Sequence, residues 1–247
     1  MLAIIGGSGL YGLGDDFATD GKAPRDTPYG DTSADILLGR WQGRELAFLP
    51  RHGEGHRVPP HRINYRANIW ALKQQGASRI ISVNAVGGIA PELAPQTLAV
   101  PDQIIDYSSG REQTFFDGGD EQARHIDFSW PYDPELRAIL VEAGEQRNLQ
   151  LVNKGTYGCT NGPRLETAAE ILRMRNDGCS MVGMTGMPEA ALARELGLDY
   201  ACLALVVNWA AGIQPREISM QEIIVNMERG MQEVKFLLSV AAGLARR

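Results

Sequence analysis

A glycine-rich turn near the amino terminus is the first part of the sequence that could hold a ligand. The apolar pair Ile4-Ile5 is followed at once by residues 6–10, Gly-Gly-Ser-Gly-Leu. A tight turn of this kind points backbone N–H groups outward, and the Ser8 hydroxyl beside them would complete a cradle for an anion. Residues 7–12 also satisfy GxGxxG, the pattern of dinucleotide-binding turns. A plain turn is the third interpretation.

The dinucleotide interpretation makes demands that the following residues do not meet. It needs a helix directly after the turn, and an acidic residue at the end of the next strand, about 20 residues on. Gly12 and Gly14 interrupt a helix at this point, and Pro24 and Pro28 occupy the place of the second strand. The sequence therefore favours an anion cradle over a Rossmann site.

A cation and a titratable ring follow the next apolar segment. Arg51 and His52 come shortly after the apolar residues 46–49, and His56 and His61 lie close behind. Ligands of open α/β folds bind where strands end, and a guanidinium suits an anionic ligand. No cysteine or carboxylate joins the histidines at metal-ligand spacing, which argues against a metal site. A solvated basic loop is the remaining alternative.

Small and polar residues also stand at the ends of two further apolar segments. Asn84 and Ala85 open the stretch Asn-Ala-Val-Gly-Gly-Ile at 84–89, where small residues let backbone amides approach a ligand closely. Asn208 closes the very apolar run 203–207. A buried amide at that place needs a hydrogen-bond partner, either in the protein or in a ligand.

Two further motifs lie about twenty residues apart. Residues 162–167 read Gly-Pro-Arg-Leu-Glu-Thr, and residues 183–189 read Gly-Met-Thr-Gly-Met-Pro-Glu. We expect Thr185 to stand at a helix start, where its hydroxyl and the free amides of the first turn favour an anion.

Short apolar runs that could position these residues alternate with helical patterns. Strands are predicted at 2–5, 79–83, 98–106, 156–159 and 201–207, and helices at 65–76, 134–147 and from a Ser219–Glu222 capping box onwards. Between residues 19 and 49 the pattern changes to a hairpin, with strands at 36–38 and 46–49 and a turn at Gln42-Gly43. We predict an α/β fold in which a mixed central sheet is flanked by helices, as one domain over residues 1–247.

Composition limits the partners of the chain. Of 247 residues, 44% are hydrophobic and 22% charged, with a net charge of −6, which argues against nucleic acid or an anionic membrane as the main partner. The three cysteines form no CxxC pair and leave an odd count, so neither a zinc site nor a disulfide framework is indicated. With no secretory signal and no apolar run long enough to span a bilayer, the expected location is the cytoplasm.

The order of the motifs closely resembles the family of methylthioadenosine phosphorylases and trimeric purine nucleoside phosphorylases. The match extends over essentially the whole chain. The segments that carry it are the Gly-Gly-Ser-Gly turn, Pro-Tyr-Gly at 28–30, Arg-His-Gly at 51–53, Asn-Tyr-Arg-Ala-Asn-Ile at 64–69, the small-residue strand end at 84–89, and the two motifs at 162–167 and 183–189. The resemblance implies a homotrimer, or a dimer of trimers, in which inorganic phosphate attacks the anomeric carbon of a purine nucleoside. Phosphate is then a co-substrate, and no metal or organic cofactor is implied.

The resemblance also implies roles for individual residues. Phosphate would be held by Ser8, Arg51, His52, Asn84, the backbone amide of Ala85, and Thr185. The nucleoside would be bound by Met184, Glu166, Asn208, Trp209, Ala210, Leu165 and Met220, and by His125 from the neighbouring subunit. The residues expected to take part in catalysis are Asn208, Arg51 and His52.

Two positions bear on the choice of nucleoside. Adenine-cleaving members carry aspartate where this chain has Asn208 and a small hydroxyl residue where it has Glu166, whereas 6-oxopurine phosphorylases carry this Asn and Glu. A carboxylate accepts from the ring N–H of hypoxanthine, and an amide donates to O6. Met220 stands where hydroxyl-recognising members place a histidine, and a methionine favours a thioether. The resemblance therefore implies S-methyl-5′-thioinosine as the substrate.

Other functions remain open from the sequence. Within the same class, the chain could cleave S-methyl-5′-thioadenosine, inosine or guanosine. From other classes, it could be a nucleotide- or anion-binding module without turnover, or a Rossmann oxidoreductase.

Overall fold

The computed structural model describes residues 1–14, 16–118 and 124–245. Its strands are β1 Leu2–Gly6, β2 Ala18–Ala23, β3 Ile36–Trp41, β4 Arg44–Pro50, β5 Arg79–Gly88, β6 Leu98–Ala99, β7 Gln103–Asp106, β8 Leu151–Val152, β9 Thr156–Cys159, β10 Cys179–Gly183 and β11 Asp199–Trp209. Its α-helices are α1 Tyr65–Gln74, α2 Pro134–Glu145, α3 Ala168–Asn176, α4 Glu189–Glu195 and α5 Met220–Leu244.

The strands within these residues form one mixed sheet. One path through it runs β2-β3-β4-β1-β5-β10-β9-β7, and β11 pairs with β5 and β6, while β6 pairs in turn with β8. At its centre, β1, β4, β5 and β11 are parallel to one another. Their carboxyl ends therefore meet at one edge of the sheet, which is where parallel sheets bind ligands.

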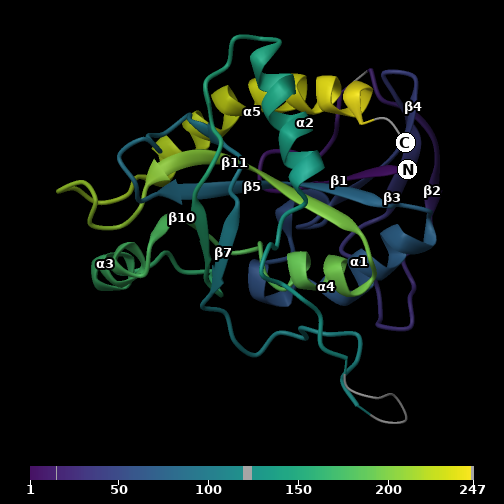
Figure 1. Cartoon of the computed structure of the whole chain (residues 1–247), viewed down its shortest axis with the longest axis horizontal. Coiled ribbons are helices and arrows are strands. Elements are labelled where there is room, and N and C mark those ends of the chain that lie inside the picture. Colours follow the sequence, from purple (N-terminus) through teal and green to yellow (C-terminus); the bar gives the residue numbers. More distant parts are fainter. Residues whose placement is uncertain (15, 119–123, 246–247) are drawn as a thin grey trace.

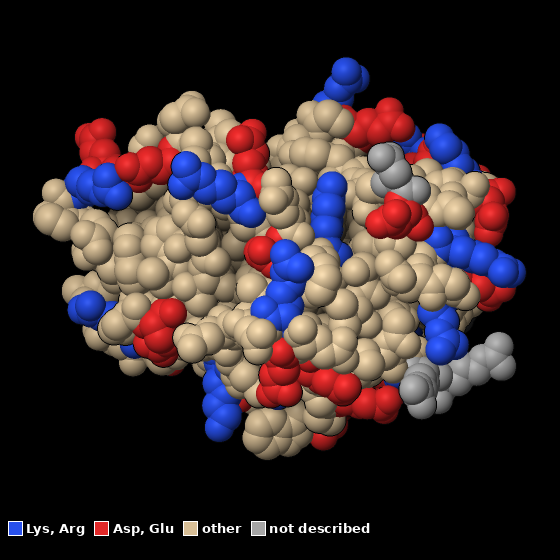
Figure 2. All heavy atoms as spheres, turned by 90° about the horizontal axis from the view of Figure 1, so that it is seen from above, with Lys and Arg blue, Asp and Glu red and all other residues tan. Residues whose placement is uncertain are grey.

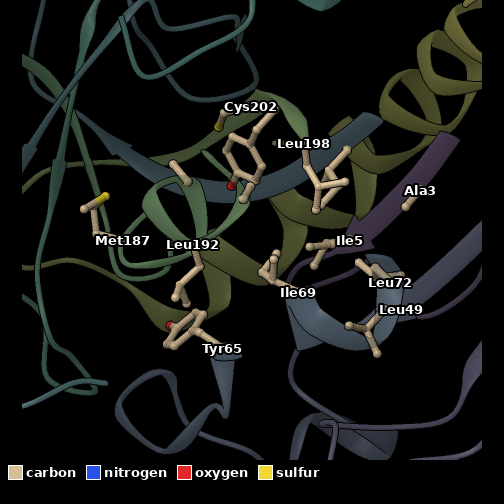
Figure 3. Close-up of a cluster of buried hydrophobic side chains, with 14 of the residues drawn as sticks. Ala3, Ile5, Leu49, Tyr65, Ile69, Leu72, Met187, Leu192, Leu198 and Cys202 are labelled. Atoms are coloured by element: carbon tan, nitrogen blue, oxygen red, sulfur yellow. The ribbon is translucent and has the colours of Figure 1, made fainter. Parts of the chain in front are cut away.

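Helices cover both faces of the sheet. Figure 1 shows α2 and α5 on one face and α1 and α4 on the other. Apolar side chains of the central strands pack under each pair of helices in two buried clusters. Figure 3 shows part of the cluster under α1 and α4, where Ile5 and Leu49 approach Ile69 and Leu192. Each such side chain contributes about 1.5–3 kcal/mol on burial, and burial on both faces explains why these strands lack an alternating pattern.

The predicted α/β architecture with a mixed sheet is confirmed, with differences at the ends of strands. The predicted strand 98–106 is two short strands, β6 and β7, because Pro101 cannot donate to a ladder. The strand predicted at 79–83 continues to Gly88. The hairpin is confirmed, with Gln42 and Gly43 both at positive φ, as a two-residue turn between right-twisted strands requires. β2 was not predicted, because five of its six residues are exposed and no apolar pattern marks it.

The ends of the helices follow capping chemistry, although one predicted capping box is incomplete. Ser219 Oγ accepts from the backbone N–H of Glu222 at 3.3 Å, but the Glu222 carboxylate pairs with Arg216, so only half of the predicted capping box is present. The complete box lies at the start of α3, where Thr167 and Glu170 each accept from the other's backbone N–H.

In the described ranges, no helix is long and apolar enough to cross a membrane. Figure 2 shows basic and acidic side chains interspersed over the face that it presents, with neither sign gathered into one field.

Candidate active site

A pocket of about 550 Å³ opens at the carboxyl edge of the sheet. It brings together most of the residues that the sequence singled out: Ser8, Arg51, His52, Asn84, Ala85, Leu165, Glu166, Met184, Thr185, Asn208 and Met220. Gly7, His56, Pro60, Val207 and Ile223 are also in its wall. Segments that are far apart in the chain thus meet in one cavity large enough for a nucleoside-sized ligand.

The glycine turn forms one side of the pocket. The backbone N–H of Leu10 donates to Gly7 O at 3.1 Å and closes the turn around Ser8, while Gly9 has a φ of 83° that favours glycine. A Cβ on Gly7 would lie 2.3 Å from the carbonyl oxygen of Val83, so only glycine lets the turn approach β5 this closely. Among the residues that the structure describes, the next element is β2 and not a helix, as the argument against a Rossmann site requires.

Arg51 follows β4 and lies completely buried beneath the pocket. Its Nε donates to Glu189 Oε2 at 2.7 Å and its Nη2 to Glu189 Oε1 at 2.8 Å. Nη2 also donates to Ser82 Oγ and Nη1 to the carbonyl oxygen of Val83. A guanidinium has five N–H groups, and these four bonds leave one hydrogen on Nη1 for a ligand.

The contacts with Glu189 keep the guanidinium of Arg51 protonated. Burial by itself would lower the pKa of the guanidinium, but the charge of Glu189 and the hydrogen bond to it more than offset the burial and raise the pKa above its ordinary value. Glu189 is equally buried and also accepts from the Tyr200 hydroxyl at 2.8 Å.

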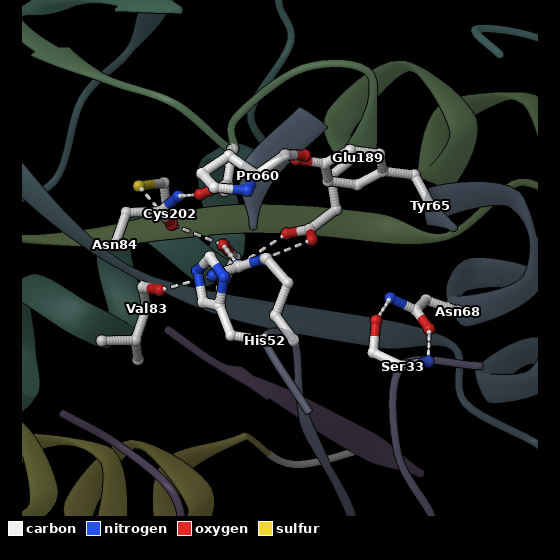
Figure 4. Close-up of polar contacts among 12 residues, drawn as sticks. Ser33, His52, Pro60, Tyr65, Asn68, Val83, Asn84, Glu189 and Cys202 are labelled. Atoms are coloured by element: carbon white, nitrogen blue, oxygen red, sulfur yellow. Dashed lines mark hydrogen bonds and ion pairs between the residues drawn. The ribbon is translucent and has the colours of Figure 1, made fainter. Parts of the chain in front are cut away.

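A chain of buried hydrogen bonds continues from Arg51 to the opposite wall of the pocket. Ser82 Oγ, which accepts from Arg51, donates to Asn84 Oδ1 at 2.5 Å, and Asn84 Nδ2 donates to Thr185 Oγ1 at 2.8 Å. In Figure 4, Asn84 of β5 and Glu189 of α4 take part in these contacts beside His52. Because Thr185 Oγ1 accepts from Asn84, its own hydrogen is left to donate into the pocket.

The position of Thr185 corrects a prediction. We expected a helix start there, but α4 begins at Glu189 with Pro188 as its N-cap, and Thr185 lies in the bend after β10. The amides of a first helical turn are therefore not beside Thr185. Its hydroxyl is positioned instead by Asn84 and by the bond from its own N–H to Tyr157 Oη at 3.4 Å.

His52 is held as a neutral ring. Nδ1 lies 2.9 Å from the carbonyl oxygen of Val58, which can only accept, so Nδ1 carries the hydrogen and Nε2 is an acceptor. Burial, and next the charge of Arg51, lower the pKa of His52 to about 3. His56 stacks against it with ring centroids 4.3 Å apart, and burial lowers the pKa of His56 as well.

Glu166 approaches the pocket from the turn before α3. Its Oε1 accepts from Thr160 Oγ1 at 2.7 Å, so Thr160 fixes the carboxylate at one oxygen. Oε2 has no further bond to the residues that the structure describes. A carboxylate held in this way can accept from a ligand N–H.

Asn208 lies at an irregularity of β11. Val206 pairs with Val86, but Asn208 pairs with Gly87, so β11 contains one extra residue at this point. Asn208 Nδ2 donates to the carbonyl oxygen of Trp209 at 2.8 Å, which leaves Oδ1 and the second amide hydrogen for other partners.

The remaining predicted substrate residues are divided among several places. Met184, Leu165 and Met220 line the pocket, with Met220 61% exposed. Trp209 and Ala210 line instead a second hollow of about 410 Å³ on the far side of Asn208. His125 is exposed in the connection between β7 and α2 and lies outside the wall of the pocket.

Sequence reasoning missed several residues that support the site. Glu189 is the last residue of the motif at 183–189, and no role was predicted for it. A carboxylate next to the apolar residues 190–193 is a usable signal, because a buried carboxylate needs a paired cation. Thr160 has no such signal. Arg111, in the connection after β7, also escaped notice: its guanidinium donates to the carbonyl oxygens of Thr160, Asn161, Met184 and Met187 and so ties two walls of the pocket together.

No cluster of three or more His, Cys, Asp or Glu residues that could hold a metal ion occurs within residues 1–14, 16–118 and 124–245. The three cysteines are free and buried, and burial raises the pKa of Cys159 to about 12. A thiol that stays protonated in this way is not a nucleophile.

Comparisons with known proteins identify the family of the chain. The model of the phosphorylase superfamily matches residues 1–241. A probable S-methyl-5′-thioinosine phosphorylase of Pseudomonas syringae pv. tomato is 54% identical over 239 residues, 97% of either chain. The 6-oxopurine nucleoside phosphorylase of Pyrococcus furiosus is 44% identical over 250 residues, covering 98% of this chain and 92% of the relative.

A solved structure shares the fold. Methylthioadenosine phosphorylase from Schistosoma mansoni, in complex with adenine, superposes with a TM-score of 0.94 at 30% identity, covering 98% of this chain and 91% of that one. The resemblance that the motif order indicated is confirmed. The chain belongs to the phosphorylase superfamily.

Proposed function

We propose that the protein cleaves S-methyl-5′-thioinosine with inorganic phosphate, giving hypoxanthine and 5-methylthioribose 1-phosphate. One observation carries the proposal: a single pocket has the hydroxyl, imidazole and amide groups of Ser8, His52, Asn84 and Thr185 among its lining, together with Glu166 and Asn208. The first set suits an oxyanion, and the second suits the edge of a 6-oxopurine. The name of the Pseudomonas syringae relative supports the same substrate.

At the phosphate end, the donors are the hydroxyls of Ser8 and Thr185, the remaining Nη1 hydrogen of Arg51, the side-chain amide of Asn84 and the backbone amide of Ala85 in β5. His52 Nε2 accepts from the P–OH group of monohydrogen phosphate, because the ring is neutral. A buried cation close to the nucleophile also stabilises the phosphate dianion in a site of low dielectric.

In the reaction, a phosphate oxygen forms a bond to the anomeric carbon while the bond from that carbon to N9 of the base breaks. The electron pair of the broken bond moves into the purine, and the sugar passes through a state with oxocarbenium character. The bound phosphate lies beside the positive charge of the sugar and stabilises it, and Met184 contacts the ribose. Stabilisation of this charge distribution by groups already in place lowers the barrier.

At the base end, Glu166 accepts from the N1–H of hypoxanthine, with the Thr160 bond keeping the carboxylate in place. The amide of Asn208 donates to O6, and its oxygen stabilises a proton on N7 of the leaving base. Adenine has no N–H at position 1, so Glu166 would meet a second acceptor there. The pair therefore favours 6-oxopurines.

At the 5′ end, Met220 and Ile223 of α5 present apolar surface to the sugar, which suits a methylthio group more than a hydroxyl. Met220 is largely exposed in the single chain. A homotrimer, with His125 of each subunit closing the pocket of its neighbour, would cover it. We propose this assembly, and a cytoplasmic location without metal or organic cofactor, as part of the same function.

Four nucleosides assayed with and without phosphate test the proposal. Purified protein is incubated with S-methyl-5′-thioinosine, S-methyl-5′-thioadenosine, inosine and guanosine, and the released base is measured. We expect phosphate-dependent release that is fastest from S-methyl-5′-thioinosine. Much faster release from S-methyl-5′-thioadenosine would contradict the roles of Glu166 and Asn208, and no release from any nucleoside would favour a binding module.

A further inference from the structure

The strand that carries Asn208 is held in an irregular shape. Up to Val206, β11 pairs residue for residue with β5, but Gly87 lies opposite Asn208, so Val207 is the extra residue of a β-bulge. Side chains alternate along a strand, and a shift by one residue moves every later side chain to the opposite face. The bulge thus brings Asn208 onto the face of Val207, which packs under α5.

Asn226 of α5 secures this bulge from outside the sheet. Its Nδ2 donates to the carbonyl oxygen of Val207 at 2.9 Å, and its Oδ1 accepts from Gln96 Nε2 at 3.2 Å. The backbone N–H of Gln96 donates in turn to the carbonyl oxygen of Val206 at 2.7 Å. Two consecutive carbonyls at the bulge are therefore held by one small network.

The backbone at Gln96 shows that the network imposes a geometry. Gln96 has a φ of 76°, a conformation that residues other than glycine adopt only when their surroundings compensate for it. Its bonds to Val206 and Asn226 supply that compensation. Asn226 itself lines the second hollow and not the pocket, so it would touch neither the nucleoside nor phosphate.

We infer that Asn226 is a positioning residue that sets the base preference by holding the Val207 bulge and, through it, the angle at which Asn208 enters the pocket. The inference rests on the proposed function, because it assumes that Asn208 contacts the base. It extends that function to a residue of α5 behind the site. A merely structural Asn226 would change stability without changing the choice of base.

The test compares Asn226→Asp with Gln232→Glu. Both variants replace an amide of α5 by a carboxylate, but Gln232 is exposed and lies outside the network. Asp at position 226 loses the donor and repels the carbonyl oxygen of Val207. We expect the ratio of kcat/KM for S-methyl-5′-thioinosine over S-methyl-5′-thioadenosine to fall about tenfold in Asn226→Asp, the effect of one misplaced hydrogen bond.

The KM for phosphate separates positioning of the base from general damage. We expect it to stay within about twofold in Asn226→Asp, since the bulge lies away from the Ser82–Asn84–Thr185 chain, and Gln232→Glu should resemble the wild type in both measurements. A base ratio in Asn226→Asp equal to that of the control overturns the inference.

Two further measurements keep the test decisive. If Asn226→Asp does not fold, Gln96→Ala removes the partner of Asn226 Oδ1 but keeps the bond to Val207, and a fall in the base ratio of about threefold is expected. An unchanged ratio overturns the inference.

Hydrogen exchange at residues 207–209 does not depend on the proposed function. Faster exchange in Asn226→Asp than in Gln232→Glu supports the inference that Asn226 holds the Val207 bulge. Equal exchange overturns that inference even if the wild type cleaves no nucleoside.

Discussion

Both carboxylate oxygens of Glu189 accept hydrogen bonds from the guanidinium of Arg51, from Nε at 2.7 Å and from Nη2 at 2.8 Å. Neither side chain has any exposed surface. The pair joins the end of β4 to the first residue of α4. It also fixes the direction in which the last Nη1 hydrogen of Arg51 points. A buried charge is tolerated only when it is paired, so the residue that orients Arg51 at the wall of the pocket also keeps the fold intact.

Removal of the charge of Glu189 should therefore affect stability and phosphate binding together. Glu189→Gln keeps the volume but leaves Arg51 as a buried cation without a counter-ion, which costs about 3–5 kcal/mol of unfolding free energy. We expect a large fall in the urea midpoint and a raised KM for phosphate. Glu233→Gln breaks the exposed pair with Arg147 and should cost less than about 1 kcal/mol. Equal losses in the two variants would contradict this account.

The neutral state of His52 predicts loss of stability in acid. Its pKa is about 3 in the folded protein against 6.5 ordinarily, so between these values the unfolded chain binds a proton that the folded chain does not. Stability must then fall as pH falls through this window, by up to about 1.4 kcal/mol per pH unit from this ring. His56, whose pKa is also lowered, adds in the same direction.

His52→Asn isolates this contribution. The asparagine amide keeps a donor for the carbonyl oxygen of Val58 but does not titrate, so the fall in unfolding free energy between pH 6.5 and pH 4.5 should be smaller than in the wild type, measured by urea unfolding at each pH. The same variant should bind phosphate more weakly, because it lacks Nε2. A pH dependence identical to that of the wild type would show that His52 is protonated in the folded protein.

Two threonines offer a test that separates the ends of the pocket. Thr185 accepts from Asn84 and directs its hydroxyl hydrogen into the cavity, whereas Thr160 donates to Glu166. Thr185→Val should raise the KM for phosphate about tenfold, the effect of one lost hydrogen bond to a charged ligand, with a smaller change for the nucleoside. Thr160→Val should raise the KM for the nucleoside and change the KM for phosphate less. The two variants are the same change in chemistry, so each is the control for the other in steady-state kinetics.

Local signals in the sequence predicted most of the regular elements of the fold, but not the features that depend on contacts between distant segments. The Asp133-Pro134 start of α2 and the Gln42-Gly43 turn depend on neighbouring residues alone, and both were predicted. The bulge at Val207 depends on how β11 meets β5 and on Asn226 of α5, contacts that no local pattern encodes. Glu222 likewise met every local requirement of a capping box, yet its carboxylate pairs with Arg216.

Local sequence signals likewise identified some residues of the candidate site and missed others. Side chains at the carboxyl ends of strands, such as Arg51 and Asn208, were found because that edge of a sheet gathers them. Thr160 acts on the site through its bond to Glu166. Arg111 acts through bonds to the carbonyl oxygens of four residues, and only the folded arrangement reveals these contacts. Thr185 was selected for a helix start that the structure does not have, although it does line the pocket.

The choice of base should respond to Asn208 more than to any other single side chain. In Asn208→Asp the donor to the carbonyl oxygen of Trp209 is lost, and the carboxylate turns towards the base, where it accepts from the exocyclic amine of adenine and holds a proton on N7. It no longer donates to O6 of hypoxanthine. We therefore expect the ratio of kcat/KM for S-methyl-5′-thioadenosine over S-methyl-5′-thioinosine to rise by about tenfold or more.

Asn176→Asp, the same change at an exposed position of α3, controls for the added charge and should leave the ratio unaltered. Glu166 limits the size of the shift, because its carboxylate still faces N1 of adenine as a second acceptor. Adding Glu166→Ser to Asn208→Asp should therefore increase the preference for adenine further, by more than Glu166→Ser does alone, since the two groups bind one base and their effects are coupled. A base ratio in Asn208→Asp that matches the Asn176→Asp control would show that Asn208 does not contact the base.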